Sequence, residues 1–510
     1  MKKLFRGVLG LLARIAVVFN RMFNKGDAAA NPAGKGTGNE ARPRRRLVDG
    51  VDADRFTRLC VVLVIGFVSL LGAVLIAVSL HSGGRRIPIE EDEAGSAAPS
   101  GRLTISFGGN IMPTQDMVDA ALTDSGYQFH NDLSELSEVL AGDITVAGLC
   151  GQVDAYGKDK DVGGIDTDKN YPDALASAVS ELGVQHIFGA NQHAFANGYD
   201  AMCATVTNLH MHSVGMIGLT TTDPKKINTR VVRVNGVSVG LAGYNCADSK
   251  DYDALTDEQK TYIAQTLPNA DDIAERAAAD IAKLKNSGAE FIVVCITWGG
   301  KGTVAQSELM KQTAPKVAQA GADVIVGYGP CVTLDAEILT REENGVSKEC
   351  YVFYSLGCLF GDNSYSGNQK ILSQKGKLTD AQKKSVEEEK KKISKINAAM
   401  KRSMTVTLSV ARGKNGTVSV ESAGYSPIYI IRNAGQGEEN AHLKYMAVPA
   451  AKYVSAEERP AIFADDAQWK SCKEAFTAIC AIADKTDGRL VLRQFDQREE
   501  TASDPADGKI

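Results

Sequence analysis

The residues of this 510-residue chain that could do chemistry stand at the ends of short apolar runs. His193 follows the run VQHIFGAN, and glycine clusters close other runs at 108–109, 299–300 and 327–329. None of these clusters has the Gly-x-x-x-x-Gly-Lys-Ser/Thr spacing of a phosphate loop, and GGKGT at 299–303 falls short of it. We therefore interpret the glycines as strand-end turns. A lone histidine at a helix entrance is more often structural than catalytic, so His193 is only a candidate catalytic residue.

The cysteines offer thiol chemistry without a metal-binding spacing. Nine of the ten lie after residue 80, and no Cys-x-x-Cys pair occurs. An odd number without such pairs excludes a small disulfide framework.

The elements that would position these residues alternate along the chain. From Leu103 onward, short apolar runs such as DITVAGL alternate with helical patterns such as YPDALASAVSELG. This alternation predicts an α/β fold with a layered sheet and loops at the strand ends that are available for a site. Helical spacing also marks 131–142. Hairpins are predicted across Asn235-Gly236 and within 405–422. Residues 375–403 predict a Lys/Glu-rich helix with little apolar face, a solvated insertion.

One segment is typical of a transmembrane helix. Leu59 to Leu80 contains no charge over 22 residues, which is long enough to cross a bilayer. Residues 1–58 carry thirteen Lys and Arg against five Asp and Glu. The positive-inside bias then places the N-terminus in the cytoplasm and the large C-terminal region outside a cell membrane crossed once.

The flanking segments differ in character. Residues 1–25 place all six of their basic side chains on one side of a helix, which favours a basic amphipathic helix on an anionic lipid surface. A loosely structured basic tail is the alternative. Residues 26–58 and 81–101 have the composition of disordered linkers, and 494–510 of a disordered tail. The net charge of −5 leaves −13 after residue 58, which argues against nucleic acid and against a broad polyanion-binding surface.

Six motifs at the predicted strand ends resemble, in order, the CapA family of capsule and poly-γ-glutamate biosynthesis proteins. They are GGNIM at 108–112, GDITVAGLC at 142–150, ANQHAFANG at 190–198, TWGG at 297–300, GYGPCV at 327–332 and YSLGCLF at 354–360. The resemblance covers about 102–362 and implies a calcineurin-like metallophosphatase fold, a sheet sandwich with flanking helices. It leaves 363–403 as a charged helical insertion. Residues 404–493 are then either the C-terminal part of the domain or a small α+β addition.

The same resemblance implies a metal site that this chain has largely replaced. The family's carboxylate, amide and imidazole ligands correspond here to Asn110, Cys150, Gln192, Thr297, Gly329, Cys331 and Cys358. Only His193 stands in its family place, with Asn191 before it, and Trp298 follows the substituted Thr297. A dinuclear hydrolase needs carboxylates and imidazoles to hold two cations and activate water. The resemblance thus implies a pocket without a metal or other cofactor, with a divalent metal in a relocated site as the alternative.

The resemblance also brings Cys150, Cys331 and Cys358 to the family site. Three interpretations stay open. These are a disulfide that locks the pocket, a zinc site with His193 as fourth ligand, and buried cysteines that fill space as small apolar residues.

Two functions follow from these observations. The first is a membrane-anchored, non-catalytic protein that binds or organises a cell-surface polymer or its synthesis complex. The second is an enzyme of the cell envelope, a hydrolase or an amide-bond-forming enzyme, with a rebuilt site. The missing ligands favour the first, and His193 with the three cysteines keeps the second open.

Overall fold

The computed structural model describes ten stretches of the chain. They are 101–155, 169–191, 193–221, 229–246, 250–262, 267–343, 345–361, 364–373, 378–432 and 445–493. The predicted lipid-surface helix, both linkers up to residue 100, the predicted transmembrane segment, the tail and Gln192 lie outside these stretches. Within them, no helix combines the length and apolarity needed to span a bilayer.

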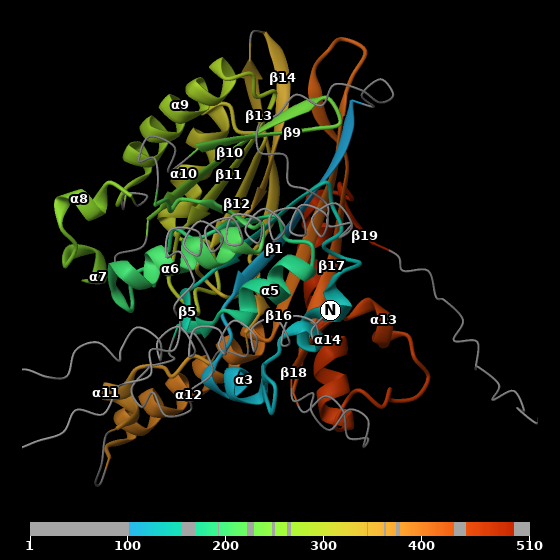
Figure 1. Cartoon of the computed structure of the whole chain (residues 1–510). Coiled ribbons are helices and arrows are strands. Elements are labelled where there is room, and N and C mark those ends of the chain that lie inside the picture. The colour runs from blue at the N-terminus through green and yellow to red at the C-terminus, as the bar shows by residue number, and fades with distance from the viewer. Residues whose placement is uncertain are drawn as a thin grey trace, which may run out of the picture. The chain divides into compact units, whose positions relative to one another are not determined.

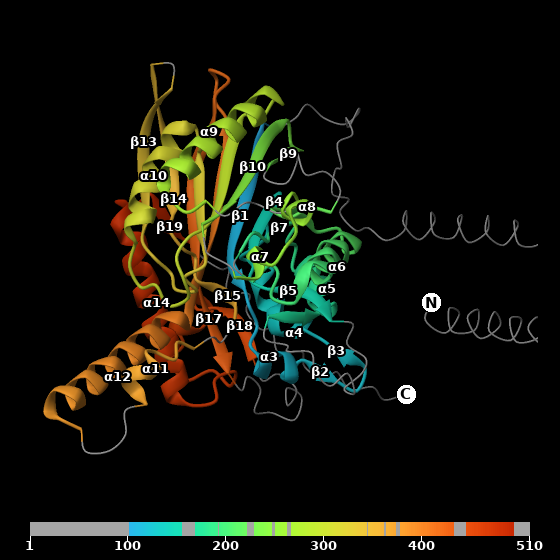
Figure 2. The same ribbon diagram turned by 90° about the vertical axis from the view of Figure 1, so that its left-hand side faces the viewer.

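Two β-sheets form the centre of the domain (Figures 1 and 2). The larger has the strand order β18-β17-β16-β1-β4-β7-β8, with β15 beside β1 and β19 beside β17. Its strands are Arg102–Ile111 (β1), Ile144–Leu149 (β4), His186–Phe188 (β7), Gly215–Ile217 (β8), Cys358–Phe360 (β15), Arg402–Arg412 (β16), Val418–Arg432 (β17), Tyr445–Pro449 (β18) and Leu490–Leu492 (β19). Because β16 pairs with β1, the C-terminal segment belongs to the same sheet as the first strand.

The smaller sheet has the order β13-β14-β12-β11-β10-β9. Its strands are Thr229–Val234 (β9), Val237–Asn245 (β10), Phe291–Thr297 (β11), Val324–Tyr328 (β12), Ala336–Glu343 (β13) and Val346–Phe353 (β14). Strands β10, β11 and β12 are parallel, and every residue of β11 and β12 is buried. Continuous apolar runs such as FIVVCIT are typical of strands covered on both faces.

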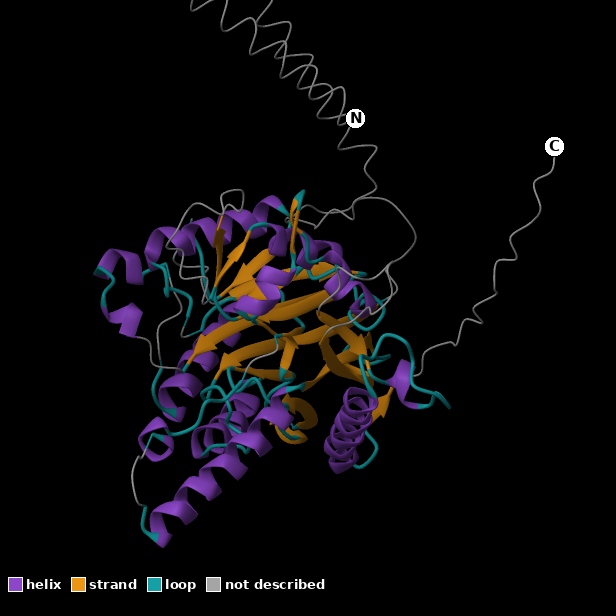
Figure 3. Cartoon of the chain, turned by 90° about the horizontal axis from the view of Figure 1, so that it is seen from below, coloured by secondary structure: helices purple, strands orange, loops and turns teal. Residues whose placement is uncertain are grey.

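Helices flank both sheets (Figure 3). They are Gln115–Ala120 (α3), His130–Leu133 (α4), Ala174–Glu181 (α5), Gly198–Met211 (α6), Lys250–Asp253 (α7), Asp257–Lys260 (α8), Ala270–Asn286 (α9), Glu308–Ala320 (α10), Gln369–Leu372 (α11), Asp380–Met400 (α12), Ala451–Val454 (α13) and Asp466–Ala483 (α14). Two small sheets pair Leu122–Thr123 (β2) with Gly126–Tyr127 (β3), and Gln152–Ala155 (β5) with Asn170–Pro172 (β6).

Three apolar layers hold this arrangement together. Side chains such as Phe107 from the larger sheet and Val293 from the smaller one form a core between the sheets. A second core lies between the larger sheet and α3 to α6, and a third between the smaller sheet and α9, α10 and α12. The prediction of a layered α/β fold with flanking helices is therefore confirmed.

The structure also tests the local predictions. The Asn235-Gly236 hairpin is confirmed, with φ angles of 52° and 79° that fit a tight two-residue turn. The hairpin within 405–422 is confirmed as β16 and β17. The helical spacing of 131–142 gives only α4 and one 3-10 turn, Ser134–Leu136. The hydroxyls of Ser134 and Ser137 donate to carbonyls three residues back, which competes with a continuing helix.

The Lys/Glu-rich helix forms as α12 and begins with a capping box of Thr379 and Gln382. Its description as solvated is wrong for its last turns. Ile396, Ala399 and Met400 are buried in the core beside the smaller sheet. The long charged helix is therefore attached firmly to the domain at its C-terminal end.

Candidate functional site

The candidate site lies at the carboxyl ends of the parallel strands. Strands β15, β1, β4 and β7 are parallel to one another in the larger sheet, as β11 and β12 are in the smaller. The Thr297 hydroxyl, at the end of β11, donates to the Ala190 carbonyl after β7 at 2.7 Å. This hydrogen bond brings the ends of the two sheets together, where open α/β sheets place their sites.

Asn110 and three cysteines form the buried centre of this edge. The Asn110 amide donates to the Cys331 sulfur at 3.9 Å, and Asn110 faces Cys358 in the β1–β15 register. The Cys331 and Cys358 thiols are hydrogen-bonded, and Cys150 lies close enough to act electrostatically on Cys358. The structure thus brings together the three cysteines that the sequence suggested would meet. None of the nine described cysteines forms a disulfide.

The two hydrogen-bonded thiols differ in acidity. The hydrogen bond from Cys358 lowers the pKa of Cys331, and the charge of Lys301 and the Asn110 amide act in the same direction. The same hydrogen bond, together with burial, raises the pKa of Cys358 well above its ordinary value. Cys331 also has a left-handed backbone, with φ of 56°. This conformation costs energy for a residue other than glycine, and such strained residues cluster at functional sites.

The other polar side chains at family positions hydrogen-bond to the main chain. The Asn191 amide donates to the Leu149 and Gly189 carbonyls at 2.6 and 2.8 Å. The fully buried Trp298 indole donates to the Tyr354 carbonyl at 2.9 Å and stacks on the Tyr354 ring. Together with the Thr297 hydrogen bond, these contacts tie strand ends together. The side chains serve the scaffold at this edge.

At Gly329 the backbone itself closes the site. Gly329 has φ of +108°, and a Cβ built there would lie 2.6 Å from the Gly299 carbonyl oxygen. The motif resemblance implies an imidazole at this position. In this chain such a side chain would need both a strained backbone and a shift of the neighbouring loop.

His193 lies in the loop that follows β7. It is half-buried, and its backbone N–H donates to the Asn191 side-chain oxygen at 2.8 Å. Among the described residues, which include His193 and the three cysteines, no group of three or more His, Cys, Asp or Glu could hold a metal ion. The residues at this edge therefore do not fit the metal centre that the family implies.

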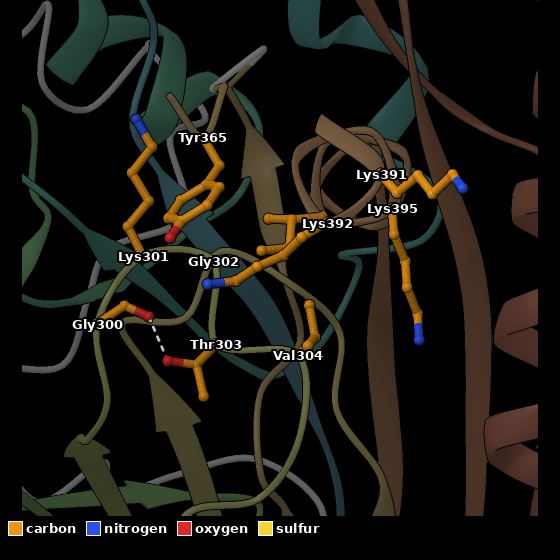
Figure 4. A pocket seen from close by; sticks show the side chains of 10 residues that line it. Gly300, Lys301, Gly302, Thr303, Val304, Tyr365, Lys391, Lys392 and Lys395 are labelled. Atoms are coloured by element: carbon orange, nitrogen blue, oxygen red, sulfur yellow. Dashed lines mark hydrogen bonds between the residues drawn. The ribbon is translucent and has the colours of Figure 1, made fainter. Parts of the chain in front are cut away.

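A pocket beside this edge was not predicted from the sequence. Its volume is about 540 Å³, and it lies between the loop 300–304 that follows β11 and the C-terminal half of α12 (Figure 4). Its walls include Tyr365, Ile396 and four lysines. These lysines are Lys301, Lys391, Lys392 and Lys395. The run KKKISK was the available signal, but the sequence could not show what α12 packs against.

Comparisons with known proteins agree with the motif resemblance. The sequence model of the family described as "Bacterial capsule synthesis protein PGA_cap" matches residues 104–363. The chain is 24% identical over 269 residues to the "PGA biosynthesis protein CapA" of Bacillus subtilis (strain 168). This match covers 52% of the chain and 64% of that relative, so it spans less than two thirds of the relative's length.

Solved structures with similarity to the chain include a putative 5'-nucleotidase from Staphylococcus aureus in complex with alpha-ketoglutarate. It is 10% identical to the chain, with a TM-score of 0.34, and the match covers 73% of this chain and 58% of the nucleotidase chain. The NAD nucleotidase (NadN) of Haemophilus influenzae is also 10% identical, with a TM-score of 0.34 and coverage of 78% and 64%.

Proposed function

The chain belongs to the bacterial capsule synthesis protein family PGA_cap, and from that premise we propose that it is a non-catalytic member. It would bind or organise a polymer of the capsule or poly-γ-glutamate type, or the complex that makes or exports it. The observation that carries this proposal is the closure at Gly329, where the Gly299 carbonyl occupies the space that a ligand side chain would need.

The neighbouring positions support the same proposal. Metal-assisted hydrolysis requires ligands that hold a cation and lower the pKa of a bound water. Here Asn110 contacts a thiol, and Thr297 and Asn191 are hydrogen-bonded to main-chain carbonyls. Side chains engaged in this way keep the strand ends in place, and this structural role supports the proposal.

We also propose that the domain acts outside the cell membrane. Leu59 to Leu80 would be the single membrane anchor, with the N-terminus in the cytoplasm. Residues 1–25 would lie on anionic lipid through their basic face, and replacing Arg6, Arg14 and Arg21 by Glu should abolish that binding. The support for this part of the proposal is the charge pattern of the sequence.

The test of the non-catalytic role compares a gene deletion with His193→Ala in the producing cell. The deletion should remove the surface polymer, and His193→Ala should restore it to the wild-type amount. Removing a proton donor from a metal-dependent enzyme would instead cost on the order of 100-fold in rate or more. A folded His193→Ala protein without polymer, or about two equivalents of a transition metal per purified chain, would overturn the proposal.

A thiol-dependent enzyme is the second candidate, because Cys331 combines a left-handed backbone with a lowered pKa. Both features are found at nucleophilic cysteines. Against it, the Cys331 side chain is only 1% exposed, which leaves a substrate no direct access. If this candidate is correct, Cys331→Ala should abolish polymer formation. The matched control is Cys472→Ala, which removes another buried thiol, in α14, and should leave polymer formation unchanged.

A further inference from the structure

The β13–β14 hairpin stays paired beyond the ends of its two strands, toward the candidate site. The strands are antiparallel, and Ala336 lies opposite Phe353 at the end farthest from the turn. An isolated antiparallel bridge continues the same register and places Thr333 opposite Leu356. The Thr333 hydroxyl also donates to the Leu356 carbonyl at 3.4 Å. The two segments therefore run side by side as they approach the strand edge.

Two cysteines occupy the next position of this register on the same side. Two residues beyond Thr333 and Leu356 the chain has Cys331 on one segment and Cys358 on the other. Opposite residues of antiparallel segments have Cα atoms about 4.5–5.5 Å apart. A disulfide needs a Cα separation of about 4.4–6.8 Å. Although Cys331 departs from strand geometry, with φ of 56°, its thiol is hydrogen-bonded to that of Cys358.

Cys150 is a third thiol in this region and the competing partner. It follows β4 in the larger sheet and acts electrostatically on Cys358. The hairpin register aligns Cys358 with Cys331 and has no position for Cys150, which comes from a distant part of the chain. The pair that the hairpin aligns is therefore Cys331 with Cys358.

From this geometry we propose that Cys331 and Cys358 are a modification site, at which oxidation forms a disulfide across the base of the β13–β14 hairpin. In the structure both residues are thiols. Cys358 lies in β15, which pairs with β1, so the bond would join the loop after β12 to the larger sheet. It would lock the two sheets together at the strand edge. The inference goes beyond the proposed function and shares with it only the location outside the membrane, where disulfides persist.

The oxidant is a disulfide compound, and the reaction is thiol–disulfide exchange. The Cys331 thiolate attacks one sulfur of the oxidant and releases the other as a thiolate, which leaves a mixed disulfide. The Cys358 thiolate then attacks the Cys331 sulfur and releases the remaining oxidant sulfur. Two protein thiols become one disulfide, and the two released thiolates take up the two protons. Cys331 is the better first nucleophile, because the hydrogen bond from Cys358 lowers its pKa.

Burial determines when this exchange can occur. Cys331 and Cys358 are 1% and 2% exposed, so an oxidant reaches them while the chain folds and not afterwards. Exchange also requires access to a sulfur atom of the disulfide. The same burial would therefore protect the finished disulfide from reductants, which makes it a structural lock on the strand edge.

The experiment refolds the full-length protein from urea in detergent, with oxidised and reduced glutathione in the buffer. Remaining thiols are blocked with N-ethylmaleimide, and the peptides from a chymotryptic digest without reductant are identified by mass spectrometry. Chymotrypsin cuts after Tyr351, which separates Cys350 from Cys358. We expect the Cys331 peptide to be linked to the Cys358 peptide. Cys331 and Cys358 that both carry N-ethylmaleimide, or a link from Cys150 to Cys358, would overturn the proposal.

Urea unfolding of the refolded protein gives a second measurement. A disulfide across the hairpin restricts the unfolded chain, so dithiothreitol should lower the wild-type urea midpoint by on the order of 0.5–1 M. Cys331→Ala should not respond to dithiothreitol, and Cys472→Ala, which removes a buried thiol in α14, should respond like the wild type. A response that persists in Cys331→Ala would overturn the assignment. Both measurements use purified protein, so their failure would leave the proposed role in polymer formation standing.

Discussion

Introducing by Gly329→His the imidazole that the motif resemblance implies should unfold part of the protein population instead of creating a metal site. The new Cβ would lie 2.6 Å from the Gly299 carbonyl oxygen and 3.4 Å from a methyl group of Thr297. Residues other than glycine rarely adopt the backbone φ of +108° found at this position. Because both the close contact and the backbone strain arise as soon as a Cβ is present, Gly329→Ala should lose most of the same stability.

The magnitude follows from two contributions. A strained backbone at a residue other than glycine costs about 1–3 kcal/mol, and forcing extra atoms into a packed site costs about 1–3 kcal/mol more. The expected loss in the free energy of unfolding is therefore about 2–6 kcal/mol, against a typical total of about 5–15 kcal/mol. Gly300→His is the matched control, because a Cβ there meets no atom within 4 Å and Gly300 has no positive φ.

The assay is urea unfolding of the full-length protein followed by circular dichroism, with metal content measured on the same samples. Gly329→His and Gly329→Ala should both have clearly lower midpoints than the wild type, and Gly300→His should stay close to it. The reasoning is refuted if Gly329→His unfolds like the wild type. It is equally refuted if that variant remains folded and takes up a transition metal in stoichiometric amount.

Three further predictions concern pH and topology. Burial, reinforced by the charge of Arg230, lowers the pKa of His186 to about 3 from an ordinary 6.5, so only the unfolded chain gains this proton as the pH falls between those values. The protein therefore loses about 2 kcal/mol of stability at pH 5. The urea midpoint of His186→Gln should fall less than that of the wild type between pH 7 and pH 5, and an equal fall would contradict this prediction. Burial raises the pKa of Asp132 to about 7 from 3.8, so stability falls as the pH rises between these values, by about 4 kcal/mol in all. Asp132→Asn should therefore gain stability over the wild type at pH 8 but not at pH 4, and a gain equal at both pH values would exclude the titration as its cause. A protease added outside intact cells should degrade the region after His81 and spare residues 1–58, whereas protection of the large domain would invert the proposed topology.

Local patterns in the sequence were sufficient for most of the fold. The period of two and the Asn235-Gly236 turn define the β9–β10 hairpin, because the turn needs positive φ at both residues and asparagine and glycine tolerate it. The buried strand β11 is recognisable because it is apolar on both faces. The helix predicted over 131–142 is wrong beyond its first turns, because apolar spacing does not reveal serine hydroxyls that hydrogen-bond to the local backbone.

The candidate site was predictable only in part. Motif order placed Cys150, Cys331 and Cys358 near one another, and the structure brings them together. The closure at Gly329 depends on the position of the Gly299 carbonyl, thirty residues away in sequence, which no local pattern encodes. The pocket of about 540 Å³ likewise requires contact between the loop 300–304 and α12. The sequence could show that α12 is charged but not which charges face a cavity.

The side chains at the strand edge and the lysines beside it both bear on the proposed non-catalytic role. A dinuclear metal centre does two things for an anionic substrate, since its positive charge attracts the anion and its bound water is activated for attack. Lysine side chains supply the first effect and not the second, because an ammonium group attracts carboxylates but does not generate hydroxide. With Lys301 on the loop after β11 and Lys392 on α12, positive charge lies beside the strand edge, where Asn110 and Gly329 supply neither a carboxylate nor an imidazole. This distribution of charge supports the proposed non-catalytic role, in which the domain would bind or organise a polymer at this edge without cleaving it.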